Sequence, residues 1–232
     1  FLGDFEIRAN GCRIGGFATQ KNKALAAYLI LEHERDHPRS KLAALFWPDV
    51  EEQAALHNLR QALSVIRKAF EPCSTGEVFS ANREGVGFRA GINISVDVNA
   101  FERQMRLMID RFHQQPGRGF PIQRLKRTLA IYSGEFLESI MLTDASMFTD
   151  WLVLRREALN RLAVEGTSLL LRYFENRNEW SEARRAADSL VSLAPWDENA
   201  HSRLIHILLR LNQGNAALAH YRSAARYFDE EL

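Results

Sequence analysis

The hydrophobic period of this 232-residue chain changes near residues 94–97, and no other sequence feature constrains the fold as much. Before this point, short stretches of alternating apolar and polar residues flank a central block with helical period. After it, every apolar pattern is helical, as in the long amphipathic segment Met147–Asn176. We therefore predict a mainly α chain, with a mixed α+β domain over residues 1–94 and an all-helical domain over residues 95–232.

The first 94 residues predict the element order β-β-α-α-α-β-β. Asn10-Gly11 is a strong turn signal between two short strands. Three helical stretches follow, with candidate N-caps at Thr19, Ser40 and Asp49. Strand-like stretches near 78–90 then predict a second hairpin.

The third of these helices, expected over 53–70, has two opposite faces. Its apolar side chains are spaced four, three and four residues apart and predict one buried stripe, made of Leu59, Leu63, Ile66 and Phe70. The other face carries hydrogen-bonding and cationic groups, which suit base edges and phosphates, and residues 53–70 contain three cations and no acid. The candidate major-groove residues are His57, Arg60, Gln61, Ser64 and Lys68, and the candidate phosphate or wing contacts are Asn58, Arg67, Lys21, Lys41 and Arg83.

A short helix, a longer helix with such a face and a hairpin follow one another in a winged helix-turn-helix. In that fold the longer helix enters the major groove of double-stranded DNA, and here the hairpin would carry Arg83 to a backbone or minor groove. Residues 1–94 hold 12 cations and 11 acids, so any DNA-binding charge is local. An alternative therefore stays open: a protein-interaction scaffold or signalling module whose winged helix binds protein rather than DNA.

The last helices contain an internal repeat. Asn178–Ala183 is echoed by Asn212–Ala217, 34 residues later, and Ala187 and Tyr221 keep the same offset. A 34-residue helix–turn–helix period with small residues at packing positions, and Pro195 at the end of the first unit, is typical of tetratricopeptide (TPR) repeats. We therefore predict TPR-like helices, with irregular helical hairpins as the alternative.

Short sequence segments in both halves of the chain also match the pattern of a known protein family. They are Phe1–Ile7, Leu25–Leu29, Leu42–Asp49 and Asn58–Lys68, then Val96–Glu102, Tyr132–Leu137, Trp151–Arg161 and Ala216–Leu232. In these segments the chain resembles SARP-type bacterial regulators, in which an OmpR-like winged helix precedes a bacterial transcriptional activator domain (BTAD). One departure is Ser64-Val65, where the helix of this family is often richer in arginine.

The resemblance implies a regulator of transcription, an activator in the usual case, that binds promoter DNA repeats sequence-specifically. It implies that the helical domain mediates dimerisation, giving a homodimer, and contacts RNA polymerase or other transcription machinery. Many relatives continue beyond the last helix into ATPase, sensor or further TPR domains. A third hypothesis, that the chain is the input half of a larger ATPase or cyclase, therefore stays open as well.

Other classes of protein fit the sequence poorly. No apolar run approaches the roughly 20 residues that span a bilayer, and the start of the chain lacks the pattern of a signal peptide. Cys12 and Cys73 match no metal or disulfide framework, so we expect a reducing, cytoplasmic location. His33–His37 matches the His-Glu-x-x-His zinc motif by letter only, because Pro38 ends the helix at once. We predict no catalytic residues, no metal and no cofactor.

Overall fold

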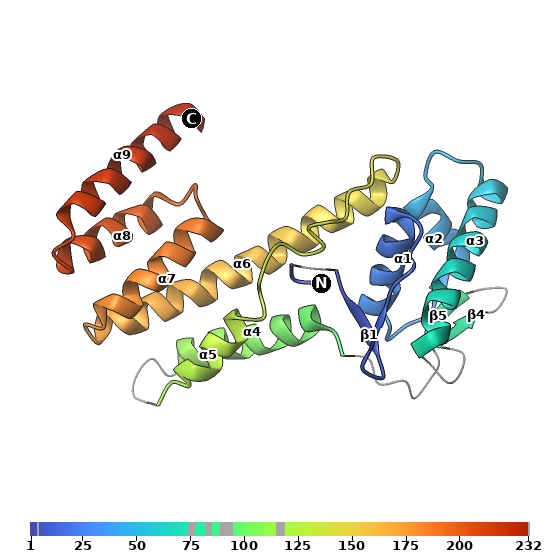
Figure 1. Cartoon of the computed structure of the whole chain (residues 1–232), viewed down its shortest axis with the longest axis horizontal. Coiled ribbons are helices and arrows are strands. Elements are labelled where there is room, and N and C mark those ends of the chain that lie inside the picture. The colour runs from blue at the N-terminus through green and yellow to red at the C-terminus, as the bar shows by residue number, and fades with distance from the viewer. Residues whose placement is uncertain (4, 74–77, 82–84, 89–94, 115–118, 232) are drawn as a thin grey trace. The chain divides into compact units, whose positions relative to one another are not determined.

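The computed structural model describes residues 1–3, 5–73, 78–81, 85–88, 95–114 and 119–231 (Figure 1). The described chain is mainly helical, as predicted. It folds into two compact units: unit 1 contains Phe1–Ala100 and Ser133–Glu157, and unit 2 contains Phe101–Tyr132 and Ala158–Leu232. Each unit is thus built from two separate stretches of chain. The boundary proposed between residues 94 and 95 stays a prediction.

Unit 1 begins with the predicted hairpin and first helix. Strands β1 (Ile7–Ala9) and β2 (Cys12–Ile14) pair antiparallel, and both turn residues have positive φ, 51° at Asn10 and 77° at Gly11. This is the backbone that Asn-Gly favours, because both residues tolerate left-handed conformations. Helix α1 (Gln20–Leu31) follows, and the side chain of Thr19 caps it by accepting a hydrogen bond from the backbone N–H of Asn22.

Two further helices follow, but their predicted caps are wrong. Helix α2 (Arg39–Phe46) begins after Pro38, and α3 (Glu52–Phe70) begins after Glu51. Neither preceding residue makes a side-chain cap hydrogen bond. Pro38 can start a helix without a cap since its ring fixes φ near the helical value, which leaves Ser40 inside the first turn. A short 3₁₀ turn, Glu71–Cys73, continues from the end of α3.

A three-stranded antiparallel sheet packs beside these helices, in the order β3-β5-β4. The hairpin of β4 (Phe79–Ala81) and β5 (Gly85–Phe88) agrees with the prediction, whereas β3 (His37–Pro38) was not predicted. A two-residue strand is too short to show alternation. Gly87 lies so close to Asp36 that a Cβ atom there would require the Asp36 carboxylate to move.

An aromatic cluster joins α1 and α2 to the second stretch of unit 1. Tyr28 meets Trp151 with ring centroids 5.1 Å apart, and Phe46 meets Phe148 at 4.9 Å. Phe136 lies 6.0 Å from Trp151. Phe148 and Trp151 belong to the first turns of α6 (Ser146–Asn176). The start of this long helix therefore forms part of the core of unit 1.

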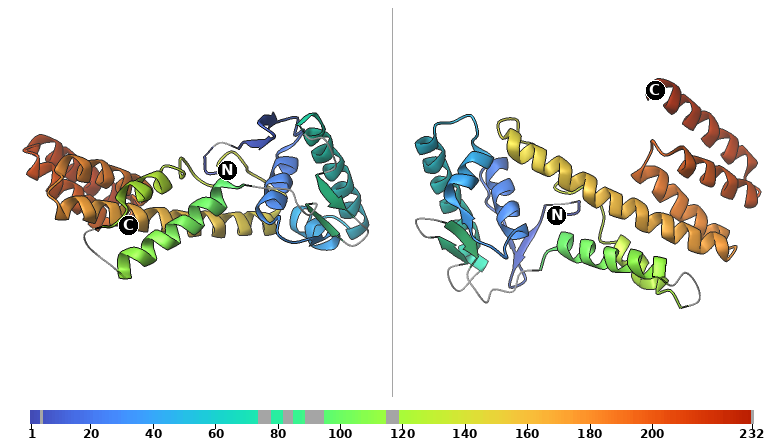
Figure 2. Two further views of the ribbon diagram at one scale, coloured as in Figure 1. Left: turned by 90° about the horizontal axis from the view of Figure 1, so that it is seen from below. Right: turned by 180° about the vertical axis from the view of Figure 1, so that it is seen from behind.

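All regular secondary structure in the described residues of unit 2 is helical. It contains most of α4 (Asp97–Gln114), then α5 (Ile122–Leu129), the rest of α6, α7 (Trp180–Leu193), α8 (Glu198–Arg210) and α9 (Gly214–Glu231). Helices α7, α8 and α9 pack one against the next (Figures 1 and 2). Of the repeat positions, Ala183, Ala187 and Ala217 are buried, whereas Tyr221 is 59% exposed. Among the described residues no helix is both long and apolar enough to cross a membrane.

The two cysteines form a disulfide, so the expectation that they match no disulfide framework is wrong. Cys12 in β2 is bonded to Cys73, 61 positions later, with Cα atoms 5.6 Å apart. The side-chain amide of Asn10 also donates a hydrogen bond to the Cys73 carbonyl at 2.9 Å. Two cysteines so far apart in sequence carry no local spacing signal, and the fold of the first hairpin against the end of α3 brings them together.

Candidate nucleic-acid interface

Helix α3 buries the stripe that its spacing predicts. Leu59 and Ile66 are fully buried and Leu63 and Phe70 are each 5% exposed. Ala55 and Ala62 are buried as well. The spacing analysis missed these two because alanine is common on either face of a helix. The burial of one side fixes which side chains the helix presents outward.

The outward face of α3 contains the residues that the sequence singles out. Asn58 is half-buried, and the exposed members are His57, Arg60, Gln61, Ser64, Arg67 and Lys68. In the described part of the chain, no carboxylate pairs with Arg60, Arg67 or Lys68. Their cationic groups can therefore meet an anionic partner without first breaking an internal ion pair.

The charges of α3 are arranged unevenly along its length. Glu51 and Glu52 stand at its start and Arg67 and Lys68 in its last turn. Each pair has the sign that stabilises its helix end, because the N-terminus carries partial positive charge and the C-terminus partial negative charge. The positive side-chain charge is thus concentrated in the second half of α3.

One aromatic contact holds the hairpin β4–β5 near this end of α3 (Figure 1). Phe70 packs edge to face on Phe79, with ring centroids 5.4 Å apart. Phe79 in turn packs on Phe88 at 4.6 Å. The hairpin is therefore packed beside the last turn of α3. Arg83, the predicted wing residue, lies outside the described residues.

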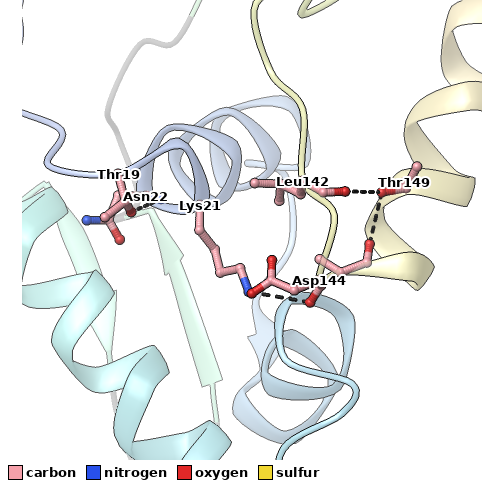
Figure 3. Close-up of polar contacts among 7 residues, drawn as sticks. Thr19, Lys21, Asn22, Leu142, Asp144 and Thr149 are labelled. Carbon is pink, nitrogen blue, oxygen red and sulfur yellow. Dashed lines mark hydrogen bonds and ion pairs between the residues drawn. The ribbon is translucent and has the colours of Figure 1, made fainter.

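The two lysine candidates differ in their surroundings. Lys41 is exposed in the first turn of α2. The side chain of Lys21 is only 13% exposed, and its Nζ lies 2.8 Å from the Asp144 carboxylate (Figure 3). It also lies 5.3 Å from the Trp47 ring centroid. Lys21 is thus held by contacts inside unit 1.

The hydrogen bond from Lys21 lowers the pKa of the Asp144 carboxyl, which is itself largely exposed. Thr149 stabilises the turn around Asp144 by donating to the Leu142 and Ala145 carbonyls, each at 3.1 Å (Figure 3). Asp144 lies 123 positions from Lys21 in the chain. No sequence signal links residues so far apart, so this pairing could not be predicted.

The fold of this chain is similar to that of a solved structure. A search of curated proteins finds no match. The solved structure of Mycobacterium tuberculosis EmbR in complex with a low-affinity phosphopeptide matches with a TM-score of 0.68 and 17% sequence identity. The match covers 100% of this chain and 59% of the EmbR chain. This similarity establishes a shared fold.

The sequence itself gives the family. Residues 96–232, more than half of the chain, match the model of the bacterial transcriptional activator domain. This region includes the segments that carry the resemblance in the second half of the chain. The chain therefore belongs to the bacterial transcriptional activator domain (BTAD) family.

Proposed function

We propose that the chain is a DNA-binding activator of transcription that acts without catalysis. In this proposal unit 1 contains an OmpR-like winged helix-turn-helix, with α3 as the recognition helix and β4–β5 as the wing. The outward face of α3 carries the proposal. It has three cations with no carboxylate partner among the described residues, and these alternate with amide, hydroxyl and imidazole groups beside a hairpin.

The side chains divide by their chemistry. Gln61 can bond an adenine edge with two hydrogen bonds, and His57 and Ser64 can donate to or accept from a base. Arg60 and Lys68 can read guanine or bind phosphate. We assign phosphate or wing contacts to Asn58, Arg67, Lys41 and Arg83. Lys21 is not part of the proposed interface, because its side chain is only 13% exposed and its ammonium group is paired with Asp144.

The helical region would supply protein contacts. We propose that α7–α9 form a TPR-like array that serves homodimerisation and binds RNA polymerase or other transcription machinery. Three large apolar side chains on α8 and α9 are about half-exposed: Leu209 at 54%, Leu218 at 49% and Tyr221 at 59%. Exposed apolar side chains suit protein–protein contacts where they gather in one patch.

The test of DNA binding is selection from a random duplex library. We would incubate the protein with the library at about 50 mM salt, where phosphate contacts are strong, and sequence the retained duplexes. Enrichment of one motif, especially as spaced repeats, is the expected result. Absence of any retained duplex would reject the proposal.

A matched pair of charge reversals locates the interface. Arg60→Glu lies on the outward face of α3, and Arg103→Glu is an exposed position in α4 that changes the net charge equally. We expect Arg60→Glu to abolish enrichment of the motif and Arg103→Glu to leave it intact. An equal loss of motif enrichment in both variants would show that the net charge of the protein, rather than the surface of α3, determines DNA binding.

The alternative is that the winged helix binds a protein. The near balance of 12 cations and 11 acids over residues 1–94 favours it, because most DNA-binding domains are clearly basic. If no duplex is retained at low salt, the DNA proposal is rejected and protein binding by the winged helix is favoured.

A further inference from the structure

Unit 2 contains an open cavity of about 590 Å³ between α5, α6 and α7. This volume is within the range of small-molecule sites. Much of its wall is apolar and includes Leu129, Ala163, Leu170, Phe174, Ala186 and Leu193. The DNA proposal uses none of these residues, and they belong to a different unit from α3.

Three charged side chains form one part of the wall. Lys126 Nζ lies 2.6 Å from one oxygen of Glu182, and Arg185 Nη1 lies 2.7 Å from the other. Both oxygens of the single carboxylate therefore already accept from a cation. The hydrogen bond from Lys126 lowers the pKa of the Glu182 carboxyl, so it is ionised at neutral pH. Two cations and one anion leave one positive charge at the cavity uncompensated.

The position of Lys126 also connects this charge to the apolar wall. Its ammonium nitrogen lies 4.8 Å from the ring centroid of Phe174. A ligand that reaches Lys126 from the cavity can therefore contact the Phe174 ring at the same time. Arg185 is 77% exposed on its side chain, so it can turn toward a ligand at little cost in packing.

Thr167 supplies a second polar feature. It is 3% exposed and lines the cavity, and its hydroxyl makes no hydrogen bond to any of the residues that the structure describes. No described side-chain oxygen or nitrogen is both buried and unpaired, so the Thr167 hydroxyl is open to the space of the cavity. A polar group of a ligand can therefore bond to it there.

We propose that this cavity binds a small organic anion with an apolar, aromatic body, a single negative charge and one further polar group. The body packs on Leu129, Leu170 and Phe174. The negative charge faces Lys126 and Arg185, and the polar group bonds to the Thr167 hydroxyl. A cationic ligand would add to the unbalanced positive charge, and a neutral one would leave it uncompensated.

A pair of fluorescent probes tests the charge requirement. 8-Anilinonaphthalene-1-sulfonate has two aromatic rings, a linking amine and one sulfonate, and N-phenyl-1-naphthylamine is the same molecule without the sulfonate. We expect the sulfonate to bind one-to-one and about tenfold more tightly than the neutral probe. We expect Arg185→Gln to remove most of this difference while leaving the neutral probe unaffected. A difference that survives Arg185→Gln would contradict the proposed charge contact.

A blocking variant tests the location. Ser189 lines the cavity and is exposed on α7, so Ser189→Trp should fill the opening without disturbing the core. Ser181 is exposed on the same helix but does not line the cavity, and Ser181→Trp is the matched control. We expect only Ser189→Trp to abolish the emission of the bound sulfonate. Equal emission from both variants, with unchanged far-UV circular dichroism, would overturn the proposal.

The role of Thr167 has its own variant. Thr167→Val keeps the shape of the side chain and removes the hydroxyl. We expect roughly threefold weaker binding of both probes, because both carry the same linking amine. Unchanged affinity for both probes would show that the Thr167 hydroxyl does not contact the bound ligand.

Discussion

Phe70, the last residue of α3, packs edge to face on Phe79, the first residue of β4, with ring centroids 5.4 Å apart. This contact connects the proposed recognition helix to the proposed wing. Phe79 is 4% exposed, so Phe79→Ala should lower the free energy of unfolding by roughly 3–5 kcal/mol. Urea unfolding followed by circular dichroism measures this loss. Phe79→Leu keeps more apolar volume and should cost less, and equal costs would argue against a packing role for the ring.

Gln61→Ala should change sequence preference more than affinity. Gln61 is exposed on the outward face of α3, and its amide can bond to one base edge with two hydrogen bonds. Loss of these bonds should cost about 1–3 kcal/mol at one position of the motif and relax the preference there. Competition binding on the selected duplex and on random duplex measures both affinities. Equal losses on the two duplexes would count against a base-reading role.

Lys68→Ala should weaken binding to all duplexes alike. Its ammonium group is exposed in the last turn of α3, where it suits a phosphate. A titration of affinity against salt concentration should give a slope about one unit smaller than in the parent protein. Arg103→Ala, at an exposed position of α4 in unit 2, is the control and should leave the slope unchanged.

Reduction of the disulfide should destabilise unit 1. Cys12–Cys73 closes a loop across 61 positions, and the loss of chain entropy in the unfolded state corresponds to about 4 kcal/mol. Urea unfolding with and without dithiothreitol measures the difference. The double variant Cys12→Ser/Cys73→Ser should unfold identically in both buffers, and a remaining effect of the reductant would refute this interpretation.

Stability should fall as the pH drops below about 6.5, in part through His220. Burial lowers the pKa of His220 and nearby His201 lowers it further, whereas Asp188 acts in the opposite direction. Because the unfolded chain takes up the proton first, the stability is complete above the ordinary value of 6.5 and is lost as the pH falls toward the lowered value.

His220 also hydrogen-bonds to a neighbouring imidazole. His201 Nε2 donates to the Pro195 carbonyl at 2.9 Å, so His201 Nδ1 accepts from His220 Nε2 at 3.1 Å. The melting temperature at pH 7.5 and pH 5.5 measures the effect. His220→Gln should show a smaller decrease than the parent protein, and an equal decrease would assign the effect to other histidines.

Local patterns were sufficient to predict α3 and its outward face. Its buried stripe repeats within nineteen residues, and such a period determines which side chains face solvent. For the same reason the amphipathic segment Met147–Asn176 agrees with α6. The turn at Asn10 also follows from its own two residues, since Asn and Gly accept positive φ.

Contacts between distant residues could not be predicted in this way. Lys21 is the clearest case. The residues around it in the sequence would be the same whether its side chain were free in solvent or paired with Asp144. The pairing of Cys12 with Cys73 depends equally on tertiary folding. The cavity of unit 2 arises from three helices, and no one of them carries a pattern for it.

The two-part construction of unit 1 has a consequence for biosynthesis. Tyr28 and Phe46 emerge from the ribosome more than a hundred residues before their partners Trp151 and Phe148. Until then, the apolar faces of α1 and α2 lack part of their cover, and the nascent chain must carry them exposed or shielded by a chaperone. Translation past residue 157 is therefore the earliest moment at which unit 1 can complete its core.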